Sequence, residues 1–147
     1  MATQSLWDEL VFQSPYLAAV KAKDLLQDGK VDEVNAVLES LVEAMGRSEK
    51  RAVSSQLTRL MLHIIKWNCQ PEKRSASWVI SIRSARREIA NSQEEMPSLN
   101  QDFLLSIWDK CFADAKQDAR DEMSKRVELK ALSWSEVFEQ TYTIWED

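Results

Sequence analysis

Residues that break helices are scarce in this sequence. Its 147 residues include only 2 glycines and 3 prolines. This scarcity argues against a protein of many tight hairpins and favours long helices with few breaks. A chain of this length can bury roughly 70% of its unfolded surface, so we expect one domain that folds without a disulfide or a metal ion.

Ligands for a metal ion are scarce too. The chain has 1 histidine, His63, and 2 cysteines, Cys69 and Cys111, which lie far apart in the sequence. A structural zinc site needs about four cysteine or histidine ligands. We therefore expect no metal site and no cofactor, and two cysteines that stay reduced.

Long apolar runs are missing as well. No uncharged apolar stretch approaches the ~20 residues that span a bilayer. The first residues, MATQSLWDELVF, have no basic region and carry Asp8 and Glu9 within their apolar stretch, unlike a signal peptide. These features predict a cytoplasmic protein with no membrane partner.

Signals that start and stop helices are easy to follow along the chain. The expected helices run from Ser14–Pro15 to Gly29, from Asp32 to Gly46, from Ser48 to Pro71, from Ser75 onward and from Ser98 onward. Residues 1–13 are expected to form an N-terminal arm or a short helix. Residues 131–147 form a short C-terminal segment, opened by a capping box of Ser133 and Glu136. Because Gly46 is followed so soon by Ser48, the pattern predicts a tight turn between two helices.

Each expected helix carries its apolar residues on one face, at spacings of three and four. In the second helix this stripe consists of Val34, Val37, Leu38, Leu41, Val42 and Met45. A helix with one apolar face must bury that face against another element, and no stretch alternates with the period of a strand. The sequence therefore predicts an all-α, single-domain helical bundle over residues 1–147, with about five main helices and short loops.

The net charge of −5 hides a strong segregation along the chain. Residues 1–46 carry a net charge of −5, residues 47–90 carry +7 and residues 91–147 carry −7. Residues 47–90 are thus a basic helical hairpin between acidic flanks. Its outward cations, a candidate anion-binding surface, are Arg51, Arg59, Lys66, Arg83 and Arg87.

Two interpretations of these cations remain open. They form ordinary solvated faces, or they bind an anion such as nucleic acid or an acidic protein. The acidic pI of about 5.0 favours the first interpretation. So does the lack of aromatic residues among the cations and of any recognisable nucleic-acid-binding motif.

The stretch HIIKWNCQPEKRSASW, residues 63–78, holds the single histidine. A catalytic imidazole needs a nucleophile beside it and a site for the oxyanion, and Cys69 points to a different side of the helix from His63. A small hydrolase or nuclease that uses His63 therefore stays an unfavoured alternative, and we assign no catalytic residue. We interpret the stretch as a structural corner, in which Trp67 and Trp78 flank the Pro71 break.

The longer run MGRSEKRAVSSQLTRLMLHIIKWNCQPEKRSASWVISIRSARREI resembles a bacterial, largely cyanobacterial family, domain of unknown function 29. The matching motif positions are His63, Trp67, Pro71, Arg74, Ser75, Trp78 and Arg87. The resemblance implies a small all-helical protein and brings no activity, cofactor or catalytic residue.

These observations favour a non-enzymatic macromolecular interaction module over an enzyme. The expected partner is another protein or a second copy of the chain. Nucleic-acid binding through the basic hairpin is the alternative, and it predicts an affinity that falls steeply with salt.

Overall fold

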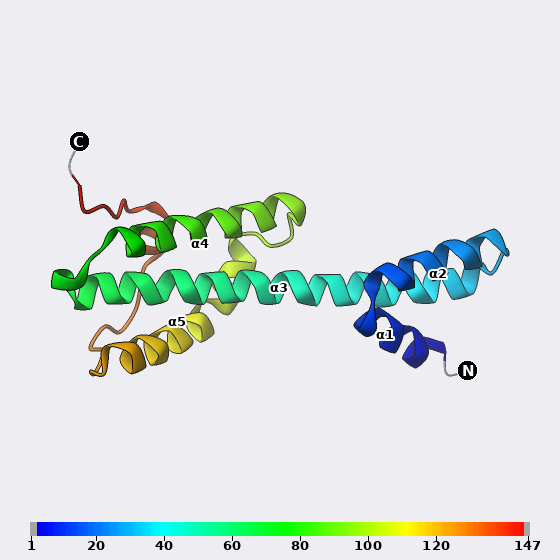
Figure 1. The fold of residues 1–147 in the computed structure, drawn as a ribbon, viewed down its shortest axis with the longest axis horizontal. Coiled ribbons are helices and arrows are strands. Elements are labelled where there is room, and N and C mark those ends of the chain that lie inside the picture. Colours follow the sequence, from blue (N-terminus) through cyan, green and yellow to red (C-terminus); the bar gives the residue numbers. More distant parts are fainter. Residues whose placement is uncertain (1–2, 146–147) are drawn as a thin grey trace. The chain divides into compact units, whose positions relative to one another are not determined.

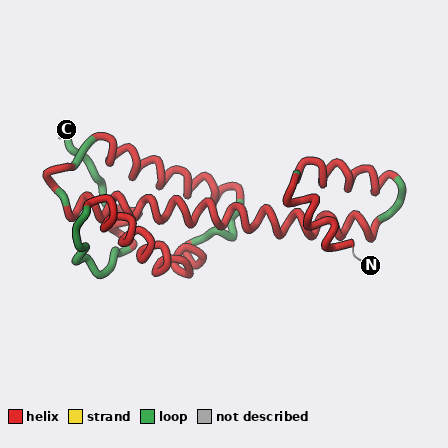
Figure 2. The backbone as a smooth tube through the Cα atoms, turned by 60° about the horizontal axis from the view of Figure 1, so that its bottom comes forward, coloured by secondary structure: helices red, strands yellow, loops and turns green. Residues whose placement is uncertain are grey.

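A computed structural model describes residues 3–145, and the chain is all-helical there (Figures 1 and 2). Its α-helices are α1 (Thr3–Gln13), α2 (Pro15–Gln27), α3 (Val31–Cys69), α4 (Ala76–Glu95) and α5 (Gln101–Met123). A 3-10 turn at Pro71–Lys73 and a π-helical turn at Ser135–Glu139 are the remaining elements of this part of the chain. The predicted all-α class with about five main helices is confirmed. Residues 1–2 and 146–147, which belong to the predicted terminal segments, lie outside the described residues.

Most of the predicted helix starts follow from local hydrogen bonds. The Leu17 amide donates to Ser14 Oγ at 3.2 Å, and the Trp78 amide donates to Ser75 Oγ at 3.3 Å. The capping box of Ser133 and Glu136 forms with both of its hydrogen bonds, at 3.0 and 3.1 Å. These side chains satisfy amides that have no partner within their own helix.

The predicted start of the fifth helix is displaced by two residues. Asn100, rather than Ser98, caps α5, because the Phe103 amide donates to Asn100 Oδ1 at 3.0 Å. The start of α3 also differs, since Val31 is its first residue and Asp32 lies in its first turn. Asp32 therefore has no capping role, although its negative charge suits the positive end of the helix dipole.

The predicted break at Gly46 is wrong. Helix α3 runs without interruption for 39 residues, so residues 47–69 continue the helix that begins at Val31. A glycine inside a helix costs about 1 kcal/mol relative to alanine, which is too little to end a helix whose turns are packed on both sides of it. Gly29 differs, because it adopts a left-handed φ of 74° after the end of α2 and does stop that helix.

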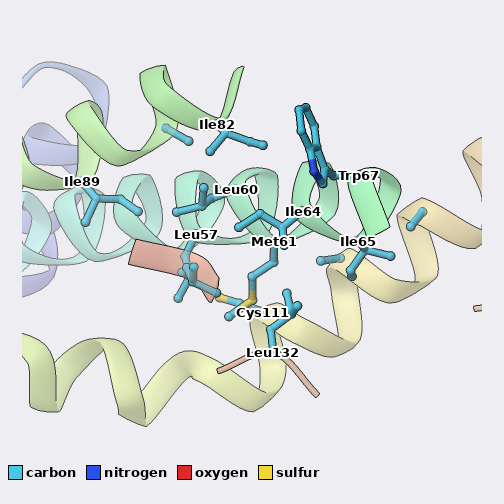
Figure 3. Packing of buried hydrophobic residues seen from close by; sticks show 14 of the residues in the cluster. Leu57, Leu60, Met61, Ile64, Ile65, Trp67, Ile82, Ile89, Cys111 and Leu132 are labelled. Atoms are coloured by element: carbon cyan, nitrogen blue, oxygen red, sulfur yellow. The ribbon is translucent and has the colours of Figure 1, made fainter. Parts of the chain in front are cut away.

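The helices group into two compact units, with the division in α3 between Lys50 and Arg51. In the second unit, the later part of α3 lies between α4 and α5 (Figures 1 and 2). Figure 3 shows side chains of α3 between Ile82 and Ile89 of α4 on one side and Cys111 of α5 and Leu132 on the other. Six α3 residues in this core are fully buried: Val53, Leu57, Leu60, Met61, Ile64 and Ile65.

The first unit has a much smaller core, made by α1, α2 and the beginning of α3. Its buried apolar residues are Trp7, Val11, Ala18, Ala22, Leu25, Val34, Val37 and Leu41. Two polar contacts tie α1 to α3: Ser40 Oγ donates to Asp8 Oδ1 at 2.5 Å, and Gln4 Nε2 donates to the Ala36 carbonyl at 3.3 Å. Two of the eight core residues are alanines, so this unit buries little apolar volume for its length.

The C-terminal segment packs against the second unit. Trp134 stacks on Trp108 with ring centroids 5.6 Å apart, and Trp108 Nε1 donates to the Leu132 carbonyl at 3.1 Å. Arg86 Nε of α4 donates to the Val137 carbonyl at 2.8 Å. The segment therefore belongs to the second unit's core. Within residues 3–145, none of the helices combines the length and the apolar character that crossing a membrane requires.

Candidate functional site

The motif residues between α3 and α4 engage one another at a corner of the second unit. Arg74 folds back over the end of α3, where its Nε donates to the Trp67 carbonyl at 2.9 Å. Its guanidinium carbon lies 4.6 Å from the centroid of the Trp67 ring. Pro71 opens the 3-10 turn that separates the two helices, and Ser75 caps α4. Each of these groups hydrogen-bonds or covers the end of a helix, so these motif residues have a structural role.

Lys66 joins this corner to α5. Its ammonium lies 2.7 Å from Glu122 Oε2 and 4.9 Å from the centroid of the Trp78 ring. The Lys66 side chain keeps only 15% of its surface exposed. A cation with a carboxylate and an aromatic face as neighbours is poorly placed to bind a further anion.

His63 lies half-buried on the flank of α3. Its Nδ1 is 2.8 Å from the Arg59 carbonyl, and this contact requires the Nδ1–H tautomer because a carbonyl only accepts. Burial lowers the pKa of His63 below its ordinary value, and the nearby charges of Lys66 and Arg59 lower it further. The hydrogen bond to the Arg59 carbonyl and the charge of Glu122 act in the opposite direction, but the net shift of the pKa is downward, which favours the neutral imidazole.

The predicted anion-binding residues do not share one environment. Lys66 is paired with Glu122, and Arg59 is half-buried with its Nη1 at 3.3 Å from Gln56 Oε1. Arg51, Arg83 and Arg87 are exposed, and within residues 3–145 none of them forms an ion pair. Two motif residues, Arg87 and His63, take no part in the corner contacts described above. Three exposed cations on two helices therefore remain from the predicted surface.

A second group of cations gathers where sequence analysis did not predict it. Open hollows near the end of α5 are lined by Lys116, Arg120, Lys125, Arg126 and Lys130. Acidic residues alternate with these cations along the chain, so the cations are hidden in the net charge of residues 91–147. Positive charge near the C-terminus of a helix also complements the helix dipole, which is sufficient reason for the group.

The largest departure from the sequence prediction is the exposed apolar surface of the first unit. Among residues 3–145, 14 large apolar side chains are exposed, and 10 of them precede Lys50. These ten are Leu6, Phe12, Tyr16, Leu17, Val20, Leu26, Val31, Leu38, Val42 and Met45. Only half of the stripe predicted to be buried in residues 34–45 is covered, because Leu38, Val42 and Met45 are 46%, 71% and 60% exposed.

Four of these residues lie on one face of α3. We call Val31, Leu38, Val42 and Met45 the α3 seam. Helix α1 contacts α3 along a different edge, through Ala36 and Ser40, so it leaves the seam uncovered. Sequence periodicity could place these residues on one face, but it could not say which part of that face α1 and α2 would reach.

Comparison with protein families gives a match over most of the chain. The profile of the family Domain of unknown function DUF29 matches residues 15–143. Because the match covers most of the chain, the chain belongs to this family, as the motif residues predicted. Comparison with curated proteins and with solved structures gave no match.

Proposed function

We propose that this member of the DUF29 family is a non-enzymatic interaction module, which binds another protein through the apolar surface of its first unit. The observation that carries the proposal is the concentration of 10 of 14 exposed large apolar residues in that unit. Single exposed apolar residues are ordinary, whereas a continuous exposed patch on a soluble protein marks an interaction site. The α3 seam is such a patch, because its members follow one another on a single helix face.

The surroundings of His63 support a module without catalysis. The Nδ1–H of His63 donates to the Arg59 carbonyl, so only the lone pair of Nε2 could take up a proton from a nucleophile. The residues beside it on α3, Arg59 and Lys66, contribute positive charge and no nucleophile. A structural role for His63 accounts for these contacts.

The charge of the first unit supports a protein partner over nucleic acid. Residues 1–46 contain 3 basic and 8 acidic residues. Phosphate groups dominate nucleic-acid affinity and require cations on the protein, so an acidic apolar surface is unsuited to them. The unpaired thiols Cys69 and Cys111 support a reducing compartment such as the cytoplasm.

The test is a comparison of two variants in affinity capture from a lysate of the source cells. One variant, Leu38→Gln/Val42→Gln/Met45→Gln, makes the α3 seam polar. The matched control, Ile80→Gln/Leu105→Gln, alters exposed apolar residues of the second unit, which are 61% and 50% exposed. We expect a protein that is retained by the wild type and the control and lost from the seam variant, and that rebinds when both components are purified. Identical sets of proteins on all three baits would overturn the proposal.

A further inference from the structure

We infer that the partner presents an amphipathic helix to the α3 seam, with an apolar contact face flanked by lysine or arginine. This inference rests on the proposed function and adds the chemistry of the partner. It follows from the shape of the seam, from its spacing and from the charges beside it.

The shape of the seam suits a side chain from another helix. Glu43 is one of five residues that line an open hollow of about 350 Å³ on α3, and the other four are Asn35, Leu38, Glu39 and Val42. Their spacing of i, i+3, i+4 and i+7 is that of the four residues that receive a knob when two helices pack side by side. The hollow is therefore ready for an apolar side chain carried by a helix.

The spacing of the seam extends this fit along α3. Val31, Leu38 and Met45 follow one another at intervals of seven residues, and Val42 lies four residues after Leu38. A repeat of seven keeps one line of side chains facing a neighbouring helix. The seam spans about 21 Å at 1.5 Å per residue, or about four helical turns. A partner helix of that length can contact every member of the seam.

The charges beside the seam specify the flanks of the partner. Asp32, Glu39 and Glu43 are exposed on the α3 edge next to the seam. Only Glu43 has an ion-pair partner among the described residues, Arg47 at 3.9 Å, and both side chains are more than 60% exposed. Such a pair is worth little in water, so these carboxylates are available to lysine or arginine on a bound helix.

A second copy of the chain suits the seam less well. A two-fold dimer brings the same patch of both copies together, and the patch belongs to a unit with a net charge of −5 over residues 1–46. Beyond Lys50, the exposed large apolar residues among those described are Ile80, Leu105, Ile144 and Trp145, of which no helix carries more than one. The second unit therefore offers no apolar stripe that could fill the seam of another copy. Charge and pattern together favour a basic helix from a different protein.

The probe is a fluorescein-labelled peptide of about 18 residues, roughly five helical turns, with leucine on one helical face and lysine on the flanks. Its control has the same leucines with glutamate in place of lysine. Fluorescence anisotropy with the full chain should show salt-sensitive binding of the lysine peptide and at least about tenfold weaker binding of the glutamate peptide.

Two variants connect the binding to the seam. Leu38→Gln/Met45→Gln should lower the affinity for the lysine peptide by about tenfold or more, since it removes two apolar anchors. Glu39→Lys/Glu43→Lys should reverse the preference, so that the glutamate peptide binds the better of the two. The control Ile80→Gln/Leu105→Gln should leave both affinities unchanged. Circular dichroism of each variant checks that its helices are intact.

The outcomes separate the inference from the proposed function. Equal binding of both peptides, or lysine-peptide binding that survives Leu38→Gln/Met45→Gln, would overturn the basic-helix inference. A dimer in light scattering that dissociates only in the seam variant would also overturn it, while leaving the seam as an interaction surface. The proposed function falls separately, if all three baits capture the same proteins from the lysate.

Discussion

Arg74 holds the end of α3 by two contacts with a single residue, Trp67. Its Nε donates to the Trp67 carbonyl at 2.9 Å, and its guanidinium lies 4.6 Å from the centroid of the Trp67 ring. The carbonyls in the last turn of a helix have no partner within the helix, and a cation there also suits the helix dipole. Arg74 thus stabilises the end of α3 just before the chain turns into α4.

Replacement of Arg74 should therefore weaken the second unit. We expect Arg74→Ala to lower the free energy of unfolding by about 1–2 kcal/mol, from one hydrogen bond and one exposed cation–π contact. Arg74→Lys should recover only part of this loss, because an ammonium cannot stack flat on the ring while it donates to the carbonyl. Urea denaturation measures both, with Lys73→Ala as the control for a neighbouring exposed cation. An Arg74→Ala protein as stable as that control would contradict the structural role of this corner.

The two glycines should respond to alanine in opposite directions. Gly46 lies inside α3, so Gly46→Ala should raise the free energy of unfolding by about 1 kcal/mol. Gly29 has a φ of 74°, which alanine adopts poorly, so Gly29→Ala should lower the free energy of unfolding by about 1 kcal/mol. Thermal unfolding followed by circular dichroism measures both changes. Destabilisation by Gly46→Ala would indicate that α3 is broken there.

His63 should make the stability of the protein depend on pH. Burial lowers the pKa of His63 in the folded state below the unfolded value of 6.5. The unfolded chain therefore binds the proton more readily, and stability falls as the pH drops through about 6.5 towards the folded pKa. Urea midpoints at about pH 7.5 and about pH 5.5 should differ less in His63→Gln than in the wild type. If the two proteins show the same pH dependence, His63 is not held neutral by the fold.

Substitutions of Tyr142 should separate two contributions to the free energy of unfolding, that of its hydrogen bond and that of its ring packing. Its hydroxyl donates to the Glu136 carbonyl at 2.6 Å, and its ring meets Trp67 edge-on with centroids 5.5 Å apart. We expect Tyr142→Phe to cost about 1 kcal/mol in the free energy of unfolding, the contribution of one hydrogen bond. Tyr142→Ala should cost about 3 kcal/mol or more, since it also leaves a cavity. Chemical denaturation monitored by tryptophan fluorescence checks both, and equal costs would assign the whole effect to the hydroxyl.

The exposed cations of α4 allow a test of whether the protein binds nucleic acid. We expect labelled DNA and RNA to show no salt-sensitive complex that depends on Arg83 and Arg87, because only three of the five predicted cations are exposed and without an ion pair among residues 3–145. Fluorescence anisotropy across a salt series compares the wild type with Arg83→Glu/Arg87→Glu. A complex that weakens steeply with salt and disappears in the variant would make nucleic acid the partner instead of a protein.

Most predictions that depend on a few neighbouring residues were accurate, although Asn100 caps α5 in place of Ser98 and Asp32 does not cap α3. Ser14, Ser75 and Ser133 cap helices as their sequence context indicates, because a capping hydrogen bond reaches only two or three residues along the chain. The predicted break at Gly46 was wrong because it was not decided by neighbouring residues alone. The local preference of Gly46 is weak, and α3 has buried apolar residues both before it, at Leu41, and after it, at Val53.

Some features of the candidate site could also be predicted from the sequence, and others depend on the tertiary structure. The sequence by itself determined the all-helical class, the family and the corner around Pro71, since these depend on composition, on motif residues and on local breaks. It also determined that Leu38, Val42 and Met45 share a helix face with Val34 and Leu41. Only the tertiary structure decided that Val34 and Leu41 are buried. It leaves Leu38, Val42 and Met45 exposed to solvent. Burial depends on how many helices are available to cover a face, and in the first unit α1 and α2 cover only part of α3.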